Sequence, residues 1–213
     1  MSELTHGPYG SMIGRTGNNV GRWVNGQNVF SIKPHASNKP ATESQINVRL
    51  ALAFIVLFLR GLAGAIKIGF KNHRKPRESA MNAAVSYNYQ KALIGVAPDF
   101  AIDYTELTFS KGPLIAPFPK FASTLTAGAA KVEFETDSDG EFSFPTDLIT
   151  VVAYSVDRER FVVLKDATTR STGSCTIQLP QSFVGDDVHF YISAMSTSGK
   201  VSDSAHVGHV TII

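Results

Sequence analysis

Three histidines near the end of this chain have the spacing closest to that of a metal site. His206 and His209 lie three positions apart, and His189 lies on a segment expected to run beside them. Neutral imidazole is a common ligand of Zn²⁺. In a regular strand, however, residues three apart point to opposite faces, so these two side chains would not meet at one ion. The pattern favours structural histidines, and we expect no metal.

The other candidates for chemistry are also incomplete. Cys175 is the single cysteine, so no intrachain disulfide is possible, and no neighbouring base or cation favours its thiolate. Residues 14–21 are rich in glycine but lack the Gly-Lys-Ser/Thr ending of a phosphate-binding loop. Residues 137–141 (DSDGE) lack the spacing of a calcium loop and are predicted as a hairpin turn. We therefore expect no enzyme, no cofactor and no small-molecule substrate.

The most apolar part of the chain is residues 42–71, TESQINVRLALAFIVLFLRGLAGAIKIGFK. Thr42 stands three residues before Gln45, as in a capping box, and Pro40 lies just upstream. The polar residues of this stretch recur at helical spacing and form one narrow stripe: Gln45, Arg49, Arg60, Lys67 and Lys71. The pattern predicts one long helix that is buried nearly all round and carries a basic ridge.

One alternative to a buried helix is a helix that spans a membrane. Only Arg60 interrupts the apolar run from Leu50 to Ile66, so the length approaches that of a membrane-spanning helix. The basic residues repeat along the helix rather than gathering at its ends, and membrane contact is therefore disfavoured. The helix also has two possible break points, Gly61 and Gly64. A helix this apolar needs packing partners on most of its sides. Either a second copy or the rest of the chain must supply them.

The N-terminal residues predict a small β-ribbon. Asn25-Gly26 separates two short apolar segments, 20–24 and 27–32, as in a hairpin with a two-residue turn, and residues 16–18 predict an earlier turn. Such a glycine-rich ribbon is marginal on its own. We expect it to dock through Trp23 and Phe30, with the edge of a neighbouring copy's sheet and the body of its own chain as equal candidates.

The remaining segments predict a second helix and then strands. Residues 78–93 have helical periodicity, and from residue 99 onward the period changes to two. The segments predicted as strands are 104–109, 130–134, 148–156, 161–165, 175–179, 188–195 and 206–212. Seven short strands over this length are typical of an immunoglobulin or fibronectin-like β-sandwich. We predict an α+β protein with a ribbon and linker at 1–40, a basic helical hairpin at 41–98 and a sandwich at 99–213.

The charge is divided unevenly along the chain. Residues 1–98 carry 12 Lys and Arg against 3 Asp and Glu, a balance of +9, whereas residues 99–213 carry 8 against 15, a balance of −7. This division suits a polyanion bound to the basic half, or attraction between opposite halves of neighbouring copies. The third interpretation is that both charged faces are simply solvated.

Several stretches resemble one uncharacterised family, the domain-of-unknown-function family numbered 6266, which is associated with Bacteroidota genomes. They are GRTGNNVGRWVNGQNVFSIKP, KPATESQINVRL, IKIGFK, SAMNAAVSYN, DYTELTFSKGPL and LPQSFVGDDVHFYISAMSTSGKVSDSAHVG. The resemblance extends over nearly the whole chain and implies no activity, cofactor or catalytic residue. The very apolar ALAFIVLFL departs from the pattern expected of relatives.

The leading functional hypothesis is a structural protein that assembles with itself, as in a filament, a shell or a virion-associated layer. The residues expected to carry assembly are Trp23, Asn25, Gly26, Phe30, Phe54 and Phe58. The alternative is sequence-independent binding of nucleic acid through phosphate contacts. The residues expected to carry it are Arg60, Lys67, Lys71, Arg74, Lys75 and Arg77. The N-terminus shows no signal peptide, so we expect the protein in the cytoplasm or in a virion.

Overall fold

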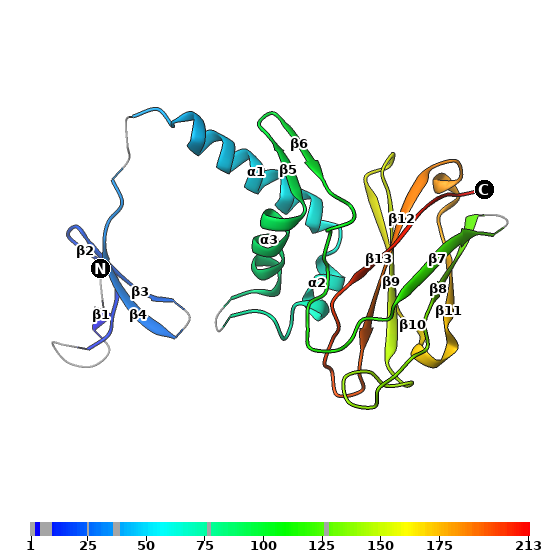
Figure 1. Ribbon diagram of the computed structural model, residues 1–213. Coiled ribbons are helices and arrows are strands. Elements are labelled where there is room, and N and C mark those ends of the chain that lie inside the picture. The colour runs from blue at the N-terminus through cyan, green and yellow to red at the C-terminus, as the bar shows by residue number, and fades with distance from the viewer. Residues whose placement is uncertain (1–2, 5–9, 25, 36–38, 76–77, 126–127) are drawn as a thin grey trace. The chain divides into compact units, whose positions relative to one another are not determined.

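The computed structural model (Figure 1) describes residues 3–4, 10–24, 26–35, 39–75, 78–125 and 128–213. The chain forms two compact units, Met1–Thr42 and Glu43–Ile213. The division into three domains predicted above stays a prediction.

The first unit is a single antiparallel sheet in the order β1-β2-β3-β4. Its strands are β1 (Glu3–Leu4), β2 (Met12–Thr16), β3 (Asn19–Val24) and β4 (Gln27–Ile32). Gly17 and Gly26 adopt positive φ angles of 58° and 78° in the turns on either side of β3. Glycine accepts this conformation without steric cost, and the meander predicted from the turn residues is confirmed.

The segment predicted as one long helix folds as two helices, and the break falls at Gly61, one of the two break points named from the sequence. Helix α1 (Glu43–Arg60) and helix α2 (Ala63–Gly69) meet at an angle of 91°. The bend lies at Gly61, where a Cβ atom would lie 2.7 Å from the ring of Phe161, and Leu62 is fully buried beside it. The ring of Phe161 thus occupies the space that a side chain would need at this position. The polar stripe predicted along one straight helix is divided by the bend.

Helix α3 (Ala80–Lys91) begins at Ser79, whose hydroxyl accepts a hydrogen bond from the backbone N–H of Asn82. It is followed by a hairpin that the sequence patterns did not predict, β5 (Leu93–Val96) and β6 (Asp99–Ile102). The helix predicted at 78–93 is therefore shorter than expected.

Residues 104–109 do not form the predicted strand, although the burial of their side chains alternates towards the end of the segment. Leu107 and Phe109 are buried, but the backbone of Thr108 pairs with a helix side chain instead of a strand. Asn88 on α3 donates to the carbonyl of Thr108 (2.7 Å) and accepts from its N–H (2.9 Å). A buried amide side chain thus replaces the neighbouring strand.

Two antiparallel sheets follow, with the orders β10-β9-β12-β13 and β11-β8-β7. The first contains β9 (Leu148–Ser155), β10 (Arg160–Thr169), β12 (Asp187–Met195) and β13 (Ala205–Thr211). The second contains β7 (Pro119–Thr124), β8 (Ala129–Phe134) and β11 (Ser174–Gln178). Two 3-10 turns, η2 (Arg170–Thr172) and η3 (Gln181–Phe183), flank β11. Six of the seven predicted strands form, and β7, which was not predicted, supplies the seventh.

The alternation along β9 explains how the second unit is layered. Val151 and Ala153 face sheet β11-β8-β7 in one hydrophobic core, whereas Val152 and Tyr154 face the helices in another. Sheet β10-β9-β12-β13 is therefore covered on both faces (Figure 1). The helices and antiparallel sheets of the structure confirm the predicted α+β class.

A buried ion pair joins the residue just before β9 to η2. Arg170 and Asp147 are almost fully buried, with 3.4 Å between Nε and Oδ2, and Arg170 also donates to the carbonyl of Ile115. The nearby segment 137–141 is not the predicted hairpin turn, because it joins strands of different sheets. Asp139 organises it by accepting hydrogen bonds from the backbone N–H groups of Glu141, Phe142 and Ser143, and these lower its pKa to about 2.

Candidate interaction surfaces

Helix α1 presents a broad apolar face that the rest of its unit does not cover. Its inner stripe, Ala51, Ile55 and Leu59, is buried against the unit's core. Six other large apolar side chains of the helix are exposed, and Arg49 and Arg60 are exposed with them: Ile46, Val48, Leu50, Leu52, Val56 and Leu57. The expectation of a helix buried nearly all round is therefore wrong within one chain. An exposed apolar surface of this extent is typical of an interface.

Phe54 and Phe58, which the sequence placed in an assembly contact, lie at the edge of this face. The ring of Phe54 packs on Phe100, and the ring of Phe58 packs edge-on against Tyr154 and Phe161. Both line an open cleft of about 780 Å³. The cleft continues the apolar surface of α1 towards β6 and the β9–β10 connection, with Leu57 on its wall.

Neither helix alone has the length and apolar content to cross a bilayer, among the residues that the structure describes. Helices α1 and α2 reach that length only when they are taken together, across their bend of 91°. Length and composition therefore identify one bent pair and no straight span in this part of the chain.

The ribbon has a second exposed apolar face. Strand register pairs Trp23 with Asn28 and Gly21 with Phe30, so Trp23 and Phe30 lie on the same face as diagonal neighbours. Their side chains are 52% and 56% exposed, and Ile32 on the same face is 70% exposed. Gly26 lies in the turn beside Trp23, and Asn25 lies outside the described residues.

Two of the basic residues predicted for nucleic-acid contact lie on or just after α2, Lys67 and Lys71. Lys67 and Lys71 lie one turn apart and line two clefts, of about 500 Å³ and about 570 Å³. Arg74 joins them in the first cleft, and Lys165 of β10 joins them in the second. Neither cleft is lined by a described acidic residue. We call these four cations and the two clefts the basic groove.

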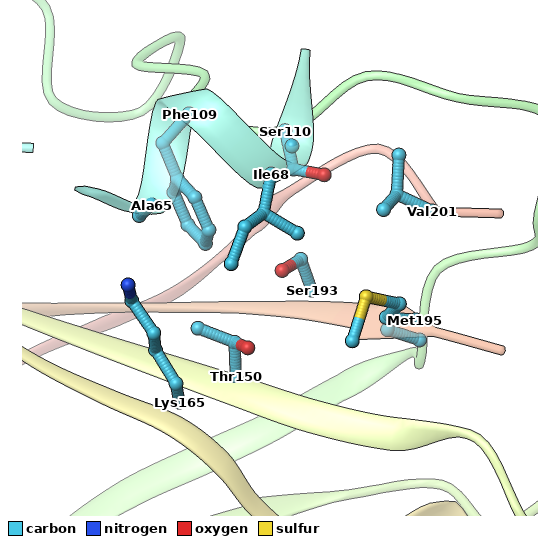
Figure 2. Close-up of a pocket in the computed structure, with 11 residues that line it drawn as sticks. Ala65, Ile68, Phe109, Ser110, Thr150, Lys165, Ser193, Met195 and Val201 are labelled. Atoms are coloured by element: carbon cyan, nitrogen blue, oxygen red, sulfur yellow. The ribbon is translucent and has the colours of Figure 1, made fainter. Parts of the chain in front are cut away.

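A small cavity lies below this groove, between α2 and the strands (Figure 2). Thr150 and Ser193 line its floor, and the side chain of Lys165 rises past it towards α2. A Cβ atom at Gly64 would lie 3.3 Å from Lys165 Nζ, so this amine lies against the first turn of α2. At about 20 Å³ the cavity admits nothing larger than a water molecule, and the groove above it is the candidate site.

The other predicted basic residues lie apart from the groove walls. Arg60 is exposed in the last turn of α1. Lys75 is exposed after α2, and its backbone N–H donates to the carboxylate of Glu78. Arg77 lies outside the described residues. The structure thus brings together Lys67, Lys71 and Arg74, and adds Lys165, which no sequence pattern indicated.

The three histidines meet, contrary to the prediction that His206 and His209 face opposite sides. Tyr191 pairs with His206 but Phe190 pairs with Gly208, which leaves Val207 as an extra residue in a β-bulge. The extra residue returns His209 to the same face as His206. Nitrogens Nδ1 of His189 and Nε2 of His206 lie 3.0 Å apart, and the rings of His189 and His209 lie 5.2 Å apart.

This histidine cluster is packed against tyrosines rather than arranged around an ion. The ring of Tyr104 lies 4.6 Å from that of His189. Burial, and then the positive charges of His206 and His209, lower the pKa of His189 to about 4, and burial lowers the pKa of His206. The described residues contain no group of three or more His, Cys, Asp or Glu arranged to hold a metal ion.

Cys175 lies buried in the core between the two sheets. Burial raises the pKa of its thiol, which disfavours the reactive thiolate. Its position agrees with the sequence interpretation of a small core residue.

Comparison with known proteins identifies the family and adds no activity. The sequence profile of a family of unknown function, DUF6266, matches residues 11–208. The chain therefore belongs to this family, as the quoted stretches indicated. No curated protein matches the chain.

Proposed function

We propose that this member of DUF6266 is a non-enzymatic structural protein that assembles with copies of itself. The ribbon of one copy lies against the exposed face of α1 in the next. The observation that carries the proposal is this face, where six large apolar side chains are exposed on a helix whose inner stripe is fully buried. Full burial of such a side chain contributes about 1.5–3 kcal/mol, and because these six are already about half buried, each can add roughly half of that amount.

The ribbon supplies the complementary surface. No large hydrophobic side chain that the structure describes in the ribbon is fully buried. Trp23, Phe30 and Ile32 are free to enter a contact with another chain. Aromatic side chains of this size dominate the energy of many interfaces.

The charges on the two proposed surfaces are mixed. Residues 10–35 include Arg15, Arg22 and Lys33 but no acidic residue. Beside the face of α1, Asp99 and Glu159 form no ion pair with a described residue. Arg49 and Arg60 are exposed on α1 itself, so the apolar and aromatic side chains, and not the net charge, support the pairing.

The contact joins two different surfaces, and in the arrangement that we propose, which is not a reciprocal exchange between two copies, each bound copy leaves one surface of each kind free. Such a head-to-tail interface generates a ring or an open polymer rather than a closed dimer.

We further infer that the two sheets form an immunoglobulin or fibronectin-like sandwich. Counting β7 as the first strand, the first, second and fifth strands form one sheet, and the third, fourth, sixth and seventh form the other. This order and the shared core support a fibronectin-like arrangement. Such folds serve many functions, so the sandwich adds little to the functional argument.

The test uses two single substitutions in the full chain, Leu57→Gln on α1 and Trp23→Ser on the ribbon. Light scattering on a sizing column should show a loss of oligomer for each. Phe118→Gln is the control for the helix variant, because Phe118 and Leu57 are equally exposed, at 67% and 66%. The control should keep the mass of the unsubstituted protein.

Mixing the two variants tests the head-to-tail arrangement. The Leu57→Gln chain keeps an intact ribbon and the Trp23→Ser chain keeps an intact helix face, so together they should form a pair of twice 23.0 kDa. If both variants keep the full oligomeric mass, the proposed surfaces are wrong. If each is monomeric but the mixture stays at 23.0 kDa, the ribbon and α1 do not bind each other.

A further inference from the structure

The basic groove is the second surface of this protein without a partner. Its cations come from separate segments, with Lys67 and Lys71 on or next to α2 and Lys165 on β10. Lys71 Nζ also lies near the β12–β13 connection, 4.0 Å from the position of a Cβ at Gly199. The groove is thus assembled by the tertiary fold and is not a single run of charge.

These cations are unneutralised. Lys67, Lys71, Arg74 and Lys165 form no ion pair with any residue in the described part of the chain. By contrast, Lys111 is paired with Asp203 and Arg158 with Asp186. Like charges held this close repel one another, and a bound anion would relieve that repulsion.

The lining of the groove indicates the class of anion. The two clefts lie on either side of Lys67 and Lys71, so a ligand that contacts all four cations must be extended. No described aromatic residue lines either cleft, so there is no platform on which unpaired bases could stack. An array of cations without base-reading groups suits a row of phosphates.

We propose that the basic groove binds the phosphate backbone of double-stranded nucleic acid without regard to base sequence. Lys67 and Lys71 form the centre of the contact, with Arg74 and Lys165 on its two sides. This activity is separate from self-assembly and uses no residue of the assembly surfaces.

The salt dependence gives the proposal a quantitative form. Four phosphate contacts predict a slope of about −3.6 for log affinity against log salt concentration. Affinity should therefore fall roughly 150-fold when salt rises from about 50 to about 200 mM. With two contacts removed, the slope becomes about −1.8 and the same increase in salt should cost roughly 12-fold.

The experiment measures fluorescence anisotropy of a labelled DNA duplex of random sequence over this salt range. The groove variant is Lys67→Gln with Lys71→Gln. The matched control is Lys91→Gln with Lys120→Gln, which removes the same charge from exposed lysines outside both clefts. All proteins carry Leu57→Gln in addition, so that assembly does not alter the number of chains on one duplex.

The groove variant should bind at least tenfold more weakly at low salt and show the shallower slope, while the control stays within twofold of its parent. Equal losses in the two double variants would overturn the proposal, because binding would then follow net charge alone. Absence of binding by the parent at about 50 mM salt would also overturn it. So would tighter binding to vesicles of anionic lipid than to duplex DNA.

Discussion

Acidification from about pH 7.5 to about pH 4.5 should destabilise the second unit through His189. Burial and the adjacent histidines lower the pKa of this residue from its ordinary value of 6.5 to about 4. Between these values the unfolded chain binds a proton that the folded chain does not. The stabilising contribution is therefore complete above pH 6.5 and is lost as the pH falls from 6.5 towards 4.

The pKa difference gives an upper bound of about 2.5 kcal/mol lost by pH 4.5. Because the ring of His189 is only partly buried, solvent screening reduces this to roughly 1–1.5 kcal/mol. His206 and His209 face the ring and oppose its protonation, while Asp187 favours it. Tyr104, which stacks on the same ring, separates it from the aromatic cleft.

Urea unfolding at the two pH values measures this loss directly. His189→Gln removes the titrating group and should reduce the decrease in unfolding free energy by roughly 1–1.5 kcal/mol relative to the unsubstituted chain. His35→Gln, at an exposed position of the ribbon unit, is the matched control. An equal decrease in the His189→Gln variant and the unsubstituted chain would refute the reasoning.

Two substitutions and one chemical modification test the packing of the second unit. Gly61→Ala should cost about 1–3 kcal/mol in urea unfolding, because its methyl group would overlap the ring of Phe161; a change below about 0.5 kcal/mol would contradict this. Asp147→Asn should cost about 3–5 kcal/mol by leaving the charge of Arg170 buried without a partner, and a stable variant would show that the pair is dispensable. Cys175 should react with a disulfide reagent at the rate of unfolding, because the thiol is buried and its pKa is raised; fast reaction of the folded chain would contradict its placement.

Features that depend on neighbouring residues in the chain were predictable from sequence. The ribbon is an example, because Gly26 marks a turn that only a few residue types accept. Six strands were predicted for the same reason, since period-two alternation between turn residues is a local signal.

Features that depend on distant residues were not predictable in this way. Gly61 was named as a break point, but the angle of 91° between α1 and α2 could not be predicted, because the ring of Phe161 that packs on Gly61 lies a hundred positions away in the chain. The segment at 104–109 has the alternation of a strand, yet Asn88 supplies its hydrogen bonds. Periodicity reports which side chains are buried and does not report which group pairs with the backbone.

In the candidate surfaces, too, the local features were predictable from sequence and the features that depend on distant residues were not. The helical spacing indicated Lys67 and Lys71, but Lys165 joins them only because β10 passes beneath α2. His206 and His209 were assigned to opposite faces on the assumption of a regular strand. A bulge at Val207 reverses that assignment, and a single-residue insertion of this kind leaves no clear periodic signal.

The most direct test of self-assembly is the molar mass of the unsubstituted full chain in solution. Light scattering on a sizing column, over a concentration series at low and at high salt, gives this value without any variant. Head-to-tail contact through apolar surfaces predicts a mass that rises with concentration beyond twice 23.0 kDa and persists at high salt. A constant mass of 23.0 kDa under all these conditions would contradict the proposal that the ribbon and α1 join copies of this chain.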